Sequence, residues 1–147
     1  LGISVAPYLA EFYPEAKKWL GRASLVFYSI PFARESEAAF QLGATALTDK
    51  SYAVRHRACS LCAYSLRQDA LPLLKRLLKH PDLKTVSDAK AAIDAIRHQN
   101  HHYFYDRSHS GKTFWEVNRG DYQISEQSRL LRWLNPVISW LSAPLKK

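Results

Sequence analysis

The sequence predicts a mainly all-α fold in which short helical hairpins stack into a small superhelix. Three observations support this: apolar residues recur with a helical period, the turns between them are short, and residues 53–64 resemble residues 85–96. A chain of 147 residues is long enough to bury a core of its own. We therefore treat residues 1–147 as a single domain.

Residues 1–31 are expected to form N-terminal helices that precede the repeat. Pro14 suits the first turn of a helix, and Pro31 is expected to end it. Between them the apolar side chains share one face at helical spacing: Trp19, Ala23, Val26, Phe27 and Ile30.

Residues 36–98 are expected to form four short helices, arranged as two hairpins. Ser36 and Ser51 are candidate N-caps of the first and second helices. Pro72 fits the first turn of the third helix, where a missing N–H costs least. Thr85 and Asp88 have the spacing of a capping box and predict the start of the fourth helix.

The second helices of the two hairpins align with each other at an offset of 32 residues. In this alignment Val54 falls on Val86, and Leu61 falls on Ile93. Self-similarity with such a period is typical of a stacked helical repeat.

The stretch "ALTDKSYAVRHRACSLCAYSL" resembles the turn and second helix of a HEAT repeat, with Asp49, Val54-Arg55 and Ala58 at the matching positions. The segment "DALPLLKRLLKHPD" resembles the first helix of a following repeat, whereas Val86-Ser87 departs from the Val-Arg pattern. The resemblance implies an armadillo-like α-solenoid of about two repeats. Such solenoids usually serve as protein-binding scaffolds; some bind nucleic acid, and a minority act on bilins or damaged DNA.

The motif C-x-x-C at Cys59 and Cys62 falls in the middle of a predicted helix. A thioredoxin-type pair belongs at a helix N-terminus after a strand, and a structural zinc site needs four ligands. The chain has two cysteines in all, and His56 is the nearest histidine in sequence. We therefore favour helix packing over a metal or redox role.

Residues 99–124 interrupt the helical period with an aromatic and histidine-rich segment. Its alternating aromatic residues, with Gly111 between the two runs, predict a small β-hairpin or an extended loop. This segment is our candidate binding face for a partner, through Tyr103, Tyr105, Arg107, His109 and Trp115. A metal site built from His101, His102, Asp106 and His109 is an alternative, but the spacing is not diagnostic and favours a polar turn.

Residues 125–147 predict an amphipathic C-terminal helix that caps the last repeat, with Pro136 as a kink. An interfacial membrane helix is less favoured because the polar face is thin. No apolar run in the sequence reaches the length of a membrane span, and two cysteines are too few for a disulfide framework. We expect a cytoplasmic protein.

The net charge of +8 favours an acidic partner, although the same charge also serves solubility. The leading hypothesis is a non-catalytic module that binds another protein through the repeat surface and the aromatic hairpin, without a cofactor, metal or catalytic residue. The alternative is nucleic-acid binding through basic helices, with these candidate residues: Arg55, Arg57, Lys75, Arg76, Lys79 and Lys90. An enzyme on a helical-repeat scaffold stays open, but no catalytic motif is visible.

Overall fold

The computed structural model describes residues 2–121, and the chain divides into two compact units, 1–115 and 116–147. The described part of the first unit contains six α-helices: α1 (Ala6–Phe12), α2 (Trp19–Ser29), α3 (Glu37–Ala46), α4 (Tyr52–Ser65), α5 (Leu71–Leu77) and α6 (Leu83–Arg97). Short 3-10 helices lie at Ile3–Val5, Ile30–Phe32, Gln68–Ala70 and His101–Phe104. The prediction of an all-α architecture is confirmed for these residues.

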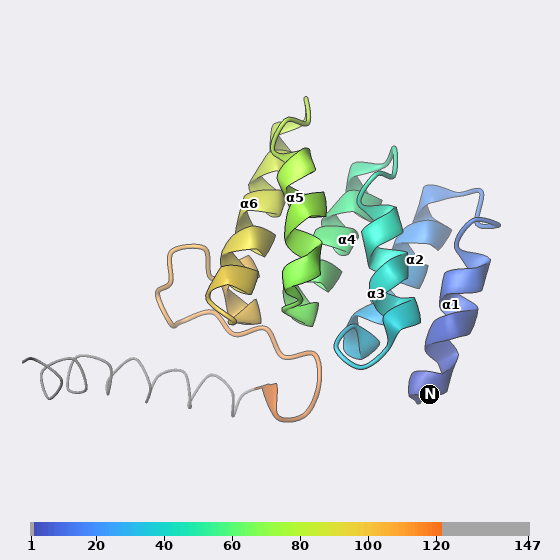
Figure 1. The fold of residues 1–147 in the computed structure, drawn as a ribbon, viewed down its shortest axis with the longest axis horizontal. Helices are drawn as coiled ribbons and strands as arrows, with labels where there is room; N and C mark the ends of the chain where they lie inside the picture. The colour runs from blue at the N-terminus through green and yellow to red at the C-terminus, as the bar shows by residue number, and fades with distance from the viewer. Residues whose placement is uncertain (1, 122–147) are drawn as a thin grey trace, which may run out of the picture. The chain divides into compact units, whose positions relative to one another are not determined.

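The helices form three hairpins that stack side by side (Figure 1). The first helices, α1, α3 and α5, make one layer, and the second helices, α2, α4 and α6, make the other. The turns inside the three hairpins, residues 13–18, 47–51 and 78–82, lie along the same edge of the stack. The pair α1–α2, which we expected ahead of the repeat, is therefore its first hairpin.

The helix ends show which local signals were read correctly. Ser36 is the N-cap of α3 as predicted, and its hydroxyl accepts a hydrogen bond from the backbone N–H of Ala39. The capping box at Thr85 was wrong, because α6 begins two residues earlier with Asp82 as its N-cap. Thr85 instead donates its hydroxyl to Asp82 inside the first turn of the helix.

Adjacent hairpins are tied together by a repeated arginine–aspartate contact. Arg22 on α2 pairs with Asp49 in the next turn, with Nε 2.6 Å from Oδ2, and its NH1 donates to the carbonyls of Ala16 and Lys17. Arg55 on α4 pairs with Asp82 at 3.0 Å, and its NH1 donates to the carbonyls of Asp49 and Lys50. Each arginine therefore holds its own turn and the turn of the following hairpin at once.

These contacts set the structural period at 33 residues, not 32 as the apolar alignment predicted. Arg55 and Asp82 each lie 33 positions after Arg22 and Asp49. The helix-ending residue Leu66 has a left-handed φ of 56°, and Gln99, 33 positions later, has a φ of 49°. The offset of 32 matched apolar residues on neighbouring helices but missed this polar framework.

The core is formed where α4 packs between α2, α3 and α6. Val54, Leu61 and Tyr64 of α4 are almost completely buried. Helix α3 approaches α4 closely at Gly43, where an added Cβ would lie 2.3 Å from Cδ2 of Leu61. A glycine at this position lets the two helices meet.

The prediction of a β-hairpin in residues 99–124 was wrong, because residues 99–121 contain no strand. After the 3-10 helix His101–Phe104 the chain forms an irregular loop. The alternation misled because these aromatic side chains pack in a cluster on the ends of α4 and α6, for example Trp115 against Tyr64. The capping helix predicted at 125–147 lies outside the described residues.

Among the described residues, no helix has the length and apolar character needed to cross a membrane.

Replacing Asp49 by alanine should lower the free energy of unfolding by about 3–5 kcal/mol, because it leaves the buried Arg22 guanidinium without its carboxylate. Asp82→Ala should cost less, since the side chain of Asp82 is 31% exposed and that of Asp49 is 6% exposed. Urea denaturation of both variants, with exposed Glu11→Ala as the control, measures this order. Equal losses would contradict it.

The same carboxylate predicts how stability depends on pH. Burial raises the pKa of Asp49, but hydrogen bonds from Arg22, Ser51 and Tyr13 outweigh it and hold the pKa below its usual value. Ionised Asp49 therefore stabilises the fold above about pH 4, the ordinary pKa of an aspartate, and this contribution disappears as the pH falls through the lower folded-state pKa. Urea denaturation between pH 7 and pH 3 should show a shallower loss of stability in Asp49→Asn than in the wild type; parallel curves would refute this.

Candidate functional site

The aromatic segment uses most of its predicted binding residues for its own packing. Tyr103 is buried and stacks on His109 with ring centroids 3.8 Å apart. Trp115 is half-buried against Tyr64 and Tyr105. Of the predicted partner-binding residues, Tyr105 and Arg107 are the most exposed.

Two neighbouring histidines fasten this segment to the hairpins and have little capacity for a metal. Nδ1 of His102 accepts a hydrogen bond from the backbone N–H of Trp115 at 2.9 Å. Nε2 of His101 lies 2.8 Å from the carbonyl of Trp115, and its Nδ1 lies 3.0 Å from the guanidinium of Arg34. Since Arg34 is a donor, His101 carries its proton on Nε2.

Asp106 folds the loop that follows. Its buried carboxylate accepts hydrogen bonds from the backbone N–H and hydroxyl of Ser110 and from the backbone N–H of Gly111. Burial raises the pKa of Asp106, but these hydrogen bonds outweigh it and leave the pKa lowered. The predicted cluster of four possible ligands therefore separates, and His109 alone turns toward other partners.

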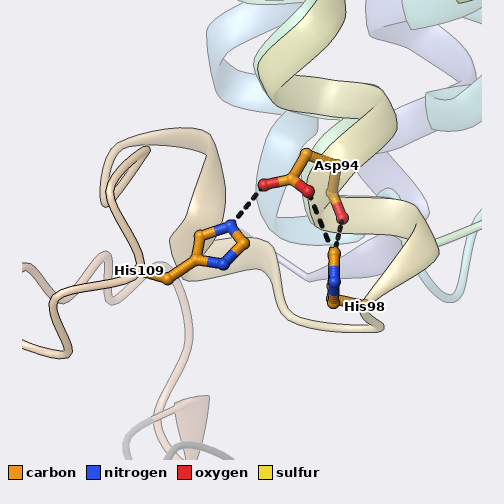
Figure 2. A group of neighbouring side chains, drawn as sticks. All are labelled: Asp94, His98 and His109. Atoms are coloured by element: carbon orange, nitrogen blue, oxygen red, sulfur yellow. Dashed lines mark hydrogen bonds and ion pairs between the residues drawn. The ribbon is translucent and has the colours of Figure 1, made fainter.

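His109 joins Asp94 and His98 at the end of α6 (Figure 2). Nε2 of His109 lies 2.5 Å from Oδ2 of Asp94, and Nδ1 of His98 lies 3.0 Å from Oδ1. One potential ligand atom from each residue lies within 4.8 Å of the other two. Sequence reasoning missed Asp94 and His98 because the loop that brings His109 back to α6 was not foreseen.

A second polar cluster surrounds Asp88 on α6. Its buried carboxylate lies 2.8 Å from Nδ1 of His56, 2.7 Å from Arg107 and 3.1 Å from the hydroxyl of Tyr52. Burial raises the pKa of Asp88, but the hydrogen bonds from His56, Arg107 and Tyr52 outweigh it and keep the carboxyl ionised. Asp88 occupies the position 33 residues after Arg55, so it ends the arginine series and lets Arg107 fasten the following loop.

The predicted nucleic-acid residues fall into two groups. Arg55 is buried in the contact with Asp82, and Arg57 lies over the ring of Phe27 at 4.3 Å, so both are engaged inside the protein. The others are exposed on α5, the turn after it, and α6: Lys75, Arg76, Lys79 and Lys90. Lys75, Lys90 and Arg97 line a groove of about 500 Å³ between α5 and α6.

A second groove of about 490 Å³ lies at the turns of the first two hairpins and was not predicted. It is lined by Lys17, Lys18, Trp19, Leu20, Lys50 and Ser51, together with the ladder residue Arg22. Trp19 is 53% exposed and Leu20 is 61% exposed, although our helical pattern placed Trp19 in the core. The run "KKWL" was the available signal, because adjacent basic and aromatic residues near a helix start are a candidate binding surface.

The charges of the described residues are distributed unevenly. Arginines neutralise the carboxylates of Glu37, Asp49, Asp69, Asp82 and Asp88. No lysine in residues 2–121 forms an ion pair with a carboxylate. The remaining surface charge is therefore largely that of lysines, in both grooves and along the turn edge.

No family model matches the chain, and neither a curated protein nor a solved structure shows significant similarity to it.

The packing interpretation of the C-x-x-C motif predicts unreactive thiols. Cys59 and Cys62 are fully buried and free, and burial raises the pKa of Cys62 to about 12 and that of Cys59 well above its usual value. At pH 8 both thiols should therefore resist a thiol reagent such as DTNB in the native protein and react in guanidinium chloride. An exposed cysteine introduced by Ser108→Cys is the positive control, and rapid reaction of either native cysteine would overturn the interpretation.

Proposed function

We propose that this chain is a HEAT-like, non-catalytic interaction module that binds an acidic segment of a partner protein. The resemblance of residues 36–98 and the stack of three hairpins support the assignment to this class. The groove that Lys17, Lys18, Trp19, Leu20 and Lys50 form carries the proposal. We call this surface the turn groove.

The turn groove has the chemistry of a protein-binding site because it joins cationic and apolar side chains. Three lysine ammonium groups without carboxylate partners provide sites for acidic side chains. Trp19 is a large, exposed anchor of the kind that dominates binding energy at protein interfaces. An extended partner with several acidic residues and one large apolar residue fits both properties.

The apolar surface of the first hairpin favours a protein over a nucleic acid at this place. Tyr8 and Phe12 on α1, and Phe27 and Tyr28 on α2, are all exposed large side chains on the helices that flank the turn groove. Clustered apolar exposure of this kind marks protein contacts, whereas nucleic-acid interfaces are more polar and more strongly charged. The partner therefore extends along α1 and α2 as well as into the turn groove.

Nucleic-acid binding is a second candidate, and the groove between α5 and α6 favours it. Lys75, Lys90 and Arg97 converge there, with Lys79 and Arg76 exposed close by in sequence. Asp94 is the acidic residue of that groove. A phosphate backbone is the simplest ligand for such a set of cations.

The test is fluorescence anisotropy with labelled 12-residue peptides that carry acidic residues around one tryptophan, leucine or phenylalanine. Lys17→Glu/Lys18→Glu should weaken binding at least tenfold, and Trp19→Ala about thirtyfold, the loss of an interface hot spot. The matched control is Lys75→Glu/Lys79→Glu, which changes the net charge equally but lies outside the turn groove. Glutamine-substituted peptides should not bind.

The opposite pattern identifies the second candidate. If labelled single- or double-stranded DNA binds, log K falls linearly with log salt concentration, and Lys75→Glu/Lys79→Glu abolishes binding, then nucleic acid is the ligand. Equal effects of the two double variants on peptide binding would also contradict the turn groove as the site.

A further inference from the structure

Three side chains able to bind a metal meet at the C-terminal end of α6, far in sequence from the turn groove. Asp94 and His98 lie one helical turn apart, and His109 returns to them from the following loop (Figure 2). The two imidazoles approach opposite oxygens of the same carboxylate, at 3.0 Å from His98 and 2.5 Å from His109. All three are accessible to solvent, with side-chain exposures of 30–49%.

The position of His109 is built by the loop around it. His109 has a left-handed φ of 54°, and its backbone N–H donates to the carbonyl of Asp106. The buried Asp106 carboxylate holds Ser110 and Gly111, the next two residues, from the other side. The loop thus turns the imidazole of His109 onto the end of α6.

Tyr103 fixes the orientation of both imidazole rings. It is buried, stacks on His109 at an interplanar angle of 12°, and contacts His98 edge-on with centroids 5.5 Å apart. His98 and His109 also contact each other edge-on at 5.2 Å. Ligands whose rings are oriented in advance lose less freedom when an ion binds.

We propose that Asp94, His98 and His109 form a binding site for a divalent transition-metal ion of the zinc class. Two imidazoles and one carboxylate are ligands that zinc, cobalt and nickel accept, whereas calcium and magnesium prefer oxygen ligands alone. On a tetrahedral ion with bonds of about 2.0 Å, ligand atoms lie about 3.3 Å apart. The present separations, all within 4.8 Å, reach that spacing by small side-chain rotations.

The proposed site has consequences for the loop and for its own strength. The ion replaces the protons that link the imidazoles to Asp94, and its fourth position is left to water. It joins α6 to the loop through three bonds and therefore stabilises the segment that packs Tyr103 and His109. Lys90 and Arg97 share a groove with Asp94, and their positive charges make binding weaker than in a closed four-ligand site.

The first test is a titration of the untagged full chain with Co²⁺, followed by its visible d–d absorption, with Zn²⁺ added as competitor. We expect saturation at one equivalent, displacement by Zn²⁺, no response to Mg²⁺, and a higher Tm with Zn²⁺. The chain has six histidines, so each alternative ligand is testable. Absence of a one-equivalent Co²⁺ complex in the folded protein would overturn the proposal.

Three variants locate the site, and one is the control. Asp94→Asn, His98→Gln and His109→Gln should each weaken Co²⁺ binding at least tenfold while the circular dichroism spectrum stays that of a folded helical protein. His80→Gln is the control, because His80 binds the backbone N–H of Asp82 at the opposite end of α6 and should leave binding unchanged. If His80→Gln weakens binding as much as the cluster variants, or the cluster variants bind as the wild type does, the proposed site is wrong.

Discussion

The stacking of the hairpins depends on a single kind of interaction, an arginine that is buried between two turns. Arg22 and Arg55 each satisfy two carbonyls of their own turn and a carboxylate of the next hairpin. A guanidinium suits this position because its fixed fork of donors serves several acceptors at once. Leu, Val and Ala side chains supply the bulk of the core, but they do not set the register of one hairpin on the next. The polar contact does.

The same constraint explains how the repeat ends. At the position that follows Arg22 and Arg55 in the series, α6 carries Asp88, which cannot hold a further turn in the same way. It accepts instead from Arg107, His56 and Tyr52, and so attaches the loop after α6 to the last hairpin. From this anchor the loop continues to Asp106 and His109. The possible metal ligands at the end of α6 are therefore a consequence of how the stack is closed.

Much of the fold could be predicted from the sequence, because helical periodicity and caps such as Ser36 are local signals. The period was misjudged by one residue, since Val54 and Val86 are both apolar although their positions in the stack differ. Asp49 and Arg55 could have revealed the true period with Asp82, but Asp88 breaks the series in the second helix of the last hairpin. The hairpin predicted at 99–124 failed for a related reason: Tyr103 and Trp115 answer to tertiary contacts with His109 and Tyr64 and not to a strand. The candidate site was only partly predictable, because His109 was recognised as a potential ligand while Asp94 and His98 meet it only through long-range folding.

The most direct test of this account is a double-mutant cycle at Arg22 and Asp49. The free energy of unfolding would be measured for the wild type, Arg22→Met, Asp49→Ala and the double variant. If the contact holds the first two hairpins together, the double variant loses less stability than the sum of the single variants, with a coupling of about 1–3 kcal/mol. Additive losses would show that the hairpins are held by apolar packing alone, and would contradict the central role of the arginine–aspartate contact.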